Sequence, residues 1–326
     1  MATAEQLKAL LRSYVEGDRD RFLTVSMQVA AHAARRGNTN LAQQLRELID
    51  EAKRQSVPSP SPASVPIARP VGELADLVAA SYPRTRLADM VLAEPARRSL
   101  ERVIAEYRQQ AKLRSHGLSA RRKLLLVGPP GCGKTMTASA LAGELKLPLL
   151  SVRLDGLITK YLGESAAKLR QVFDSMTVKC GVYLFDEFDA IGSDRARPNE
   201  VGEIRRVLNS FLQFVEADDS DSLILAATNQ VEILDPALFR RFDDVIRYGL
   251  ANAELAEELI RNALNVFTLR GDDWAEVRRV SEGLSYAEIS RACTEAAKSA
   301  VLTDRRDLST NDILAALRER QGIRQQ

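Results

Sequence analysis

The sequence of 326 residues has few of the side chains on which many active sites depend. It holds only two histidines, His32 and His116, which argues against histidine-based catalysis and against a histidine metal site. Its three cysteines show no C-x-x-C spacing, so we expect no structural zinc and a reducing compartment. The sequence also lacks an H-E-x-x-H or serine-triad signature, so no protease activity is expected.

Long apolar runs and a strong net charge are missing too. No apolar run reaches the roughly 18 residues that span a bilayer, and the N-terminal stretch has no signal-peptide core. Lysine and arginine number 46 and aspartate and glutamate 44, a net charge of +2. This balance gives no general attraction to nucleic acid or to an anionic membrane. We therefore expect a cytoplasmic protein without membrane association, and we do not favour nucleic acid as its partner.

The sequence does have one glycine-rich stretch of the form G-x-x-x-x-G-K-T, which runs through Gly128, Pro129, Pro130, Gly131, Cys132, Gly133, Lys134 and Thr135. The apolar segment Lys123–Val127 precedes it, and Met136–Leu145 follows with a helical pattern. This strand–loop–helix context is that of a phosphate-binding loop. Glycines let backbone N–H groups turn toward phosphate oxygens, and the helix adds the positive end of its dipole.

The last residues of this loop have distinct expected roles. Lys134 would neutralise the β- and γ-phosphates of a nucleotide, and the Thr135 hydroxyl would ligate Mg²⁺. The alternative of a chance glycine-rich turn is weakened by the flanking strand and helix. A dinucleotide fingerprint fits less well, because its third glycine would fall on Met136, which is too large for close helix–strand packing.

Polar residues follow two further apolar segments. Asp186 and Glu187 come directly after Val182–Phe185, and the run Ala226-Ala227-Thr228-Asn229 ends another strand. Ligands lie at the carboxyl ends of parallel strands, so Asp186 would hold Mg²⁺ and Glu187 would polarise the attacking water. Asn229 would bond the γ-phosphate and that water. The alternatives are two solvated acids and a turn-forming asparagine, and the phosphate loop upstream favours the functional roles.

From about Gly72 the sequence alternates between strand and helix patterns, which indicates a parallel sheet with helices on both faces. The expected strands are Lys123–Val127, Leu149–Leu154, Val182–Phe185, Leu223–Ala227 and Val245–Tyr248. No strand is expected after Gly249. Four helices should follow, near Ala253–Phe267, Asp273–Glu282, Ser285–Thr303 and Thr310–Arg320, the third opened by a capping box of Ser285 and Glu288. The predicted class is an α/β phosphate-loop NTPase with a small C-terminal helical lid.

The chain before this sheet has a different pattern. Residues 1–55 predict three short amphipathic helices, which would either serve oligomerisation or dock a substrate or partner; we favour docking. Residues 56–70 hold five of the twelve prolines and four serines, the composition of an extended linker. The predicted domains are thus 1–55, 56–70, the α/β domain 71–248 and the helical lid 249–326.

Four motifs together resemble the AAA (AAA+) ATPases of the protein-remodelling type. They are Gly128–Thr135, Asp186–Arg195, Ala226–Asn229 and Leu234–Asp243, and the resemblance spans about residues 87 to 305. It implies a Mg²⁺-dependent ATPase that forms a homo-oligomeric ring, a hexamer, and remodels, unfolds or translocates protein substrates. It also implies Walker A for the first motif, Walker B for Asp186 and Glu187, and sensor 1 for Asn229.

The same resemblance extends to three further sets of residues. Arg240 and Arg241 would supply an arginine finger to the neighbouring subunit; they are adjacent, as in the severing and membrane-scission branch, which leaves open which one acts. Lys160, Tyr161 and Leu162 resemble the first pore loop, which grips extended polypeptide, whereas the alternative packs Tyr161 on its own domain. Ala287 and Met136 are expected at the nucleotide, and Tyr286 stands where the family has a glycine close to the adenine.

The N-terminal bundle and its tether resemble those of bacterial AAA proteins that work beside a subtilisin-like protease in defence or plasmid-incompatibility systems. Two alternatives remain. One is an AAA regulator or loader that acts on nucleic acid or a nucleic-acid enzyme. Against it, the basic pairs of this chain, such as Arg121-Arg122 and Arg278-Arg279, are interspersed with acids, as on a solvated surface. The other is a nucleotide switch without turnover, against which the paired acids and arginines argue.

Overall fold

The computed structural model describes Ser26, Gln43, Gln44 and residues 74–154, 164–188, 198–230 and 239–324. The chain divides into two units, Met1–Pro66 and Ile67–Gln326. The predicted bundle of residues 1–55 lies outside the described residues except at those three positions, and the linker of residues 56–70 lies outside them entirely. The predicted pore-loop residues Lys160, Tyr161 and Leu162 are outside them as well.

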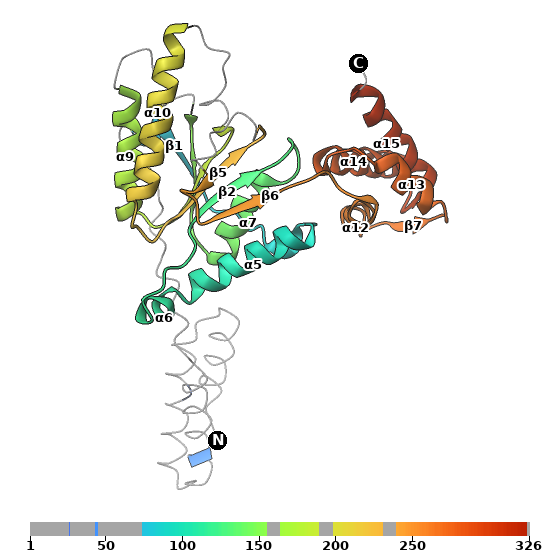
Figure 1. Cartoon of the computed structure of the whole chain (residues 1–326). Coiled ribbons are helices and arrows are strands. Elements are labelled where there is room, and N and C mark those ends of the chain that lie inside the picture. Colours follow the sequence, from blue (N-terminus) through green and yellow to red (C-terminus); the bar gives the residue numbers. More distant parts are fainter. Residues whose placement is uncertain are drawn as a thin grey trace. The chain divides into compact units, whose positions relative to one another are not determined.

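A six-stranded sheet organises the second unit, in the order β1-β3-β4-β5-β2-β6 (Figure 1). Its strands are β1 (Val78–Ser81), β2 (Lys123–Val127), β3 (Leu149–Val152), β4 (Val182–Phe185), β5 (Leu223–Thr228) and β6 (Asp244–Arg247). All neighbours pair in parallel except β1, which runs antiparallel to β3. The predicted α/β class with a largely parallel sheet is confirmed.

Two strands, β2 and β4, have the bounds that the sequence predicts, and three differ at their ends. Strand β3 ends at Val152, where the chain leaves the sheet. Leu154 is still buried in the same core, which explains why the apolar pattern continues past the strand. Strand β5 continues to Thr228, and β6 begins and ends one residue earlier than expected. The edge strand β1 is missed, because four residues of mixed burial carry no strong apolar pattern.

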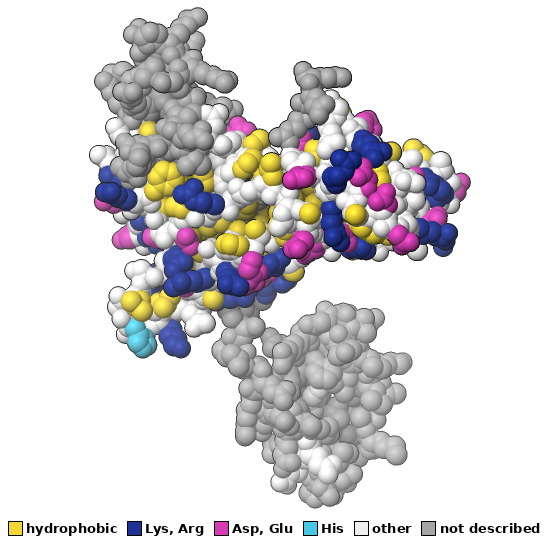
Figure 2. Space-filling view, turned by 45° about the vertical axis from the view of Figure 1, so that its right-hand side comes forward, with side chains coloured by type: hydrophobic (Ala, Val, Ile, Leu, Met, Phe, Trp, Pro, Cys, Tyr) yellow, Lys and Arg dark blue, Asp and Glu magenta, His cyan; other side chains and the backbone are white. Residues whose placement is uncertain are grey.

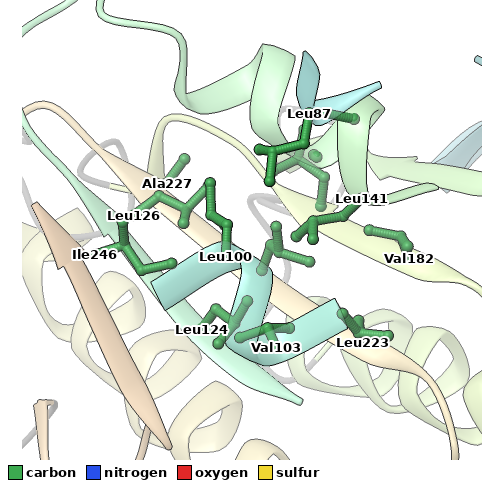
Figure 3. Close-up of a cluster of buried hydrophobic side chains, with 14 of the residues drawn as sticks. Leu87, Leu100, Val103, Leu124, Leu126, Leu141, Val182, Leu223, Ala227 and Ile246 are labelled. Atoms are coloured by element: carbon green, nitrogen blue, oxygen red, sulfur yellow. The ribbon is translucent and has the colours of Figure 1, made fainter. Parts of the chain in front are cut away.

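Helices cover both faces of the sheet because side chains alternate along each strand. On β2, Leu124 and Leu126 face α5 (Glu94–Arg108) and α7 (Lys134–Leu145), where they meet residues such as Leu100 (Figure 3). Two short elements flank α5 in sequence, the 3₁₀ helix η1 (Leu87–Asp89) before it and α6 (Gln110–Ser115) after it. This layer supports the start of α7, where the glycine-rich loop ends.

The opposite face of the sheet packs against α9 (Glu164–Val178), α10 (Pro198–Ala217) and the short α4 (Leu74–Leu77) (Figure 1). Five phenylalanine rings pack against one another there, with Phe214 lying 5.5 Å from Phe173. The ring of Phe211 lies 5.8, 4.9 and 4.5 Å from those of Phe173, Phe185 and Phe188. Such pairs add about 0.5–1.5 kcal/mol each beyond area burial, so this layer holds the carboxyl end of β4 rigidly.

A separate core holds the C-terminal lid, formed by α12 (Ala253–Ala263), α13 (Trp274–Ser281), α14 (Tyr286–Leu302) and α15 (Thr310–Arg324). The capping box at the start of α14 is confirmed. Ser285 N donates to Glu288 Oε2 at 2.7 Å, and Glu288 N donates to Ser285 Oγ at 3.3 Å.

The expectation that no strand follows Gly249 is wrong. Strands β7 (Thr268–Arg270) and β8 (Asp307–Ser309) form a short parallel pair within the lid. The predicted helix Ala253–Phe267 ends at Ala263 for the same reason, since the chain turns there to enter β7. Phe267 still packs on the lid core, which explains why the apolar pattern runs past the end of the helix.

Candidate functional site

The glycine-rich loop after β2 follows a backbone path that only glycine adopts easily. Gly128, Gly131 and Gly133 have φ values of +150°, +73° and +96°. A Cβ added at Gly128 would lie 2.3 Å from the Tyr248 carbonyl oxygen, and one at Gly131 would lie 2.8 Å from Ser285 Oγ. The loop therefore lies close to the backbone that follows β6 on one side and to the lid on the other.

Lys134 is the first residue of α7, two residues before the predicted start of that helix, and its side chain is buried, with 6% relative exposure. Its Nζ donates to Gly128 O and Pro129 O at 2.8 Å and to Asn229 Oδ1 at 2.7 Å. These contacts place a positive charge between the loop and the end of β5. The N-terminal end of α7 adds partial positive charge at the same place, so the location favours an anion.

Asp186 and Glu187 directly follow β4 and face the same loop. Thr135 Oγ1 donates to Asp186 Oδ2 at 2.6 Å, and Glu187 N donates to Asp186 Oδ1 at 2.9 Å. Glu187 has a φ of +51°, one of three positive values at non-glycine residues among those described. Strained backbone of this kind concentrates at functional sites. Because β5 lies between β2 and β4, the sequence-distant residues Thr135, Asp186 and Asn229 meet at one edge of the sheet.

The donor atoms at this edge fit Mg²⁺. A hydroxyl oxygen and a carboxylate oxygen 2.6 Å apart are hard ligands on adjacent elements, and Glu187 adds a second carboxylate beside them. Mg²⁺ is usually held by one or two carboxylates together with substrate phosphates and water. The described residues contain no cluster of three or more histidine, cysteine, aspartate or glutamate side chains suited to a metal. Thr135 and Asp186 would therefore share the ion with a phosphate.

A cavity of about 580 Å³ opens beside the loop and has one polar end. Its polar end is lined by Lys134, Thr135, Asp186, Glu187 and Asn229. The rest of its lining comes from three places, the segment before α5, helix α12 and the start of α14, and combines apolar residues with the polar residues Asp89, Asn262 and Ser290. The apolar residues there include Met90, Val91, Leu259, Ala263, Tyr286 and Ala287. A volume of this size lies within the usual range for sites that hold small molecules.

Most of the residues predicted from the sequence line this cavity. Among the loop residues, those from Pro130 to Met136 do so, together with Asp186, Glu187, Asn229 and Ala287. The Ala287 N–H donates to Gly131 O at 3.0 Å, which ties the lid to the loop. Sequence reasoning did not identify the walls formed by Met90, Val91, Leu259 and Ala263. Isolated apolar residues far apart in the chain carry no signal that separates a cavity wall from a core.

The two arginines predicted to form a finger lie elsewhere. Neither Arg240 nor Arg241 is among the described residues that line the cavity. Arg240 is exposed, and Arg241 forms an ion pair with Glu216 near the end of α10. The segment just before them, residues 231–238, lies outside the described residues. Within one subunit the described geometry therefore brings neither arginine to the polar end of the cavity.

Several known proteins are similar to this chain in sequence. The family model described as "ATPase family associated with various cellular activities (AAA)" matches residues 124–250. An uncharacterized AAA family ATPase, y4kL, of Sinorhizobium fredii is 36% identical over 319 residues, covering 98% of this chain and 96% of that protein. The proteasome-activating nucleotidase of Methanopyrus kandleri is 35% identical over 209 residues, 62% of this chain.

The present chain spans only 48% of the length of that nucleotidase. Among solved structures, the crystal structure of the FIGL-1 AAA domain has a TM-score of 0.60 and 24% identity, covering 74% of this chain and 85% of that chain. That domain and this chain have the same fold. Fold and site together define a phosphate-loop nucleotide-binding protein.

More narrowly, the chain belongs to the AAA ATPase family. Membership in this family implies that the chain binds a nucleotide, ATP. In the part of the chain that the structure describes, no helix combines the length and the apolar character needed to cross a membrane.

The cysteines offer a chemical test of the cavity. Burial raises the pKa of the Cys132 thiol and raises that of Cys293 to about 12, whereas Cys180 is exposed. A raised pKa lowers the thiolate fraction at neutral pH. We expect iodoacetamide to modify Cys180 first, Cys132 more slowly and Cys293 last, as followed by peptide mass spectrometry. Modification of Cys132 should speed up as the pH rises toward its pKa.

Because Cys132 lines the cavity, ADP should slow its modification further while leaving the rate at Cys180 unchanged, so Cys180 serves as the internal control. Fast modification of Cys132 that ADP does not affect would contradict the placement of the nucleotide against the loop.

Proposed function

We propose that this chain is a Mg²⁺-dependent ATPase that assembles into a homo-oligomeric ring, a hexamer, and remodels or translocates protein substrates. The observation that carries the ATPase part is the convergence of Lys134, Thr135, Asp186, Glu187 and Asn229 at the polar end of one cavity. Residues 71–248 would form the catalytic domain and residues 249–326 the lid. Residues 1–55, tethered by residues 56–70, would dock a substrate or partner.

Each side chain at the polar end has a specific task in this proposal. Lys134 binds the β- and γ-phosphates, with its amine already directed by the loop carbonyls. Glu187 orients a water in line with the γ-phosphate and takes up its proton. Asn229, which accepts a hydrogen bond from Lys134, would bond the γ-phosphate and that water. Bound between Thr135 and Asp186, Mg²⁺ would offset charge on the phosphate oxygens.

The ring is supported by the position of the paired arginines. Exposed Arg240 and the adjacent Arg241 lie outside the described lining of their own subunit's cavity, so they would act on the ATP of a neighbouring subunit. An arginine supplied in trans stabilises charge that develops on the γ-phosphate. Hydrolysis would then require that subunits assemble.

Action on protein rests on the family and on Tyr161, which remains a sequence-based proposal. A relative that matches much of this chain is named a proteasome-activating nucleotidase, which supports work on polypeptides beside a separate protease. A subtilisin-like protease would be that partner here. All three cysteines are free thiols, which supports the reducing cytoplasm as the location.

Surface charge supports a protein substrate over nucleic acid. Basic and acidic side chains alternate over the face shown in Figure 2 instead of forming a basic stripe. Many of the paired arginines seen in the sequence are engaged by acids. Examples are Arg122 with Asp218 and Arg279 with Glu276. Phosphate-backbone binding needs a continuous positive surface, so these pairs do not supply one.

The catalytic assignment is tested by two substitutions in the same site. Glu187→Gln should keep ATP binding and abolish turnover, because the amide cannot take up a proton from water. Lys134→Ala should weaken binding itself, because the phosphates lose their buried cation. Binding is measured by calorimetry and turnover by phosphate release. Hydrolysis by Glu187→Gln at the wild-type rate would show that another group orients the water.

Action in trans is tested by mixing inactive subunits. Lys134→Ala subunits keep their arginines, and Arg240→Ala/Arg241→Ala subunits keep their loops, so a mixture should regain activity at shared interfaces. The arginine is worth roughly 10³-fold in rate, so even sparse productive interfaces are detectable. Mixing Lys134→Ala with Glu187→Gln is the matched control. Both lesions lie on the same side of the interface, and no site in that mixture is complete.

The mixing experiment requires rings that contain both kinds of subunit. Cross-linking of differently tagged subunits, followed by mass spectrometry, establishes this. Equal inactivity of both mixtures, in rings shown to contain both subunits, would rule out action in trans. Activity in the control mixture would mean that the loop and Glu187 act across the interface too.

The role of Tyr161 separates a translocating ring from a plain ATPase. Tyr161→Ala should leave basal hydrolysis and assembly near wild type and remove the stimulation of turnover by casein, an unfolded polypeptide. Tyr161→Phe should behave as wild type, because the flat ring grips the chain and the hydroxyl does not. A loss of about 3 kcal/mol or more of unfolding free energy in Tyr161→Ala would instead mark a buried core residue.

A further inference from the structure

Tyr248 directly follows β6 and contacts the start of the glycine-rich loop through its backbone. Its N–H donates to Val127 O at 2.7 Å. Its carbonyl oxygen lies so close to Gly128 that a Cβ added there would come within 2.3 Å of it. The first glycine of the loop is therefore fixed against the backbone of Tyr248, although Tyr248 is not among the residues that line the cavity.

The side chain of Tyr248 reaches the other end of the loop through Thr137. The two hydroxyl oxygens lie 2.7 Å apart, and Thr137 Oγ1 donates to Gly133 O at 3.1 Å. A threonine hydroxyl has one proton to give, so the Tyr248 hydroxyl donates to Thr137. Both side chains are buried, and burial raises the pKa of Tyr248 to about 12, so the phenol keeps its proton at neutral pH. A buried chain of two hydrogen bonds thus runs from Tyr248 to the last glycine of the loop.

The carbonyl group of Gly133, where this chain ends, sets the direction of the last peptide of the loop. It also accepts from Thr137 N at 2.8 Å, so two donors of one residue hold it. In a planar trans peptide the C=O and the N–H point in opposite directions. A Gly133 carbonyl that is directed into α7 therefore turns the N–H of Lys134 out of the helix end, where an anion is favoured.

A loop built on glycines needs such contacts, because glycine loses more conformational freedom on ordering than any other residue. When the N–H groups already point inward, phosphate binding does not have to supply that ordering. We propose that Tyr248 is a positioning residue for phosphate binding, which holds Gly128 through its backbone and Gly133 through Thr137. This role rests on the nucleotide-binding function proposed above for the loop.

A second buried tyrosine supplies the matched control. Tyr183 lies in β4 within the other core of the sheet, and its hydroxyl donates to Lys179 O at 3.0 Å. Lys179 precedes β4, whereas the glycine-rich loop follows the carboxyl end of β2, so this bond lies at the opposite edge of the sheet. Burial raises the pKa of Tyr183 to about 12 as well. Tyr183→Phe therefore removes a comparable buried hydroxyl away from the loop.

The test measures the binding of inorganic tripolyphosphate and of ADP to the full chain by calorimetry. Tyr248→Phe keeps the ring and removes the donor, so both affinities should fall about fivefold, the scale of one net hydrogen bond. Thr137→Val should cause the same loss, and Thr137→Ser, which keeps the hydroxyl, should bind as the wild type does. Combining Tyr248→Phe with Thr137→Val should lose no more than either change alone, because both interrupt one chain. Tyr183→Phe should lower thermal stability and leave both affinities within about twofold.

Amide hydrogen exchange of the nucleotide-free protein supplies a second readout, which a role in packing alone would not change. The loop amides should exchange faster in Tyr248→Phe and Thr137→Val than in the wild type, and at the wild-type rate in Tyr183→Phe. A Tyr248→Phe chain that loses thermal stability but keeps wild-type affinity for both probes would overturn the proposal. An equal loss of affinity in Tyr183→Phe would overturn it too.

Failure of the proposed function would appear differently. A wild-type chain that binds neither tripolyphosphate nor ADP would overturn this proposal together with the nucleotide site. The ATPase assignment is tested separately by phosphate release, which these binding measurements do not involve.

Discussion

A buried ammonium group at the start of a helix is the constraint on which this structure depends. Lys134 opens α7 with only 6% relative exposure, where the helix end already carries partial positive charge. Burying such a charge costs several kcal/mol unless it is paired. Oxygens of Gly128, Pro129 and Asn229 accept hydrogen bonds from it. The two loop carbonyls reach the ammonium group because the loop glycines adopt positive φ. The result is a fixed positive site that suits an anion.

The order of strands explains why residues far apart in the chain share that site. Strand β5 lies between β2 and β4, so the loop after β2, the acids after β4 and Asn229 after β5 end at one edge of a parallel sheet. The phenylalanine cluster around Phe211 holds β4 from one face, and α5 and α7 hold β2 from the other. The lid closes the remaining side through the bond from Ala287 to Gly131.

The sequence predicted the parts of this arrangement that depend on local chemistry. Strands β2 and β4 are continuous buried runs, and the capping box at Ser285 is a local hydrogen-bond pattern, so both could be predicted. Strand β1 and the β7–β8 pair could not, because short strands are fixed by distant partners such as β3. The motifs predicted that the loop Gly128–Thr135 and the acids Asp186 and Glu187 belong to one site. The walls from Met90 and Leu259 appear only once the fold joins separate segments.

The central claim is that this convergence of Lys134, Thr135, Asp186, Glu187 and Asn229 makes a metal-dependent ATPase. The most direct measurement is the steady-state release of phosphate from ATP by the purified wild-type chain, with Mg²⁺ present and after its removal by EDTA. The account predicts sustained turnover that stops when the metal is removed and resumes when Mg²⁺ is restored. Tight binding of ATP with no phosphate release in the presence of Mg²⁺, at concentrations where the chain is assembled, would contradict it.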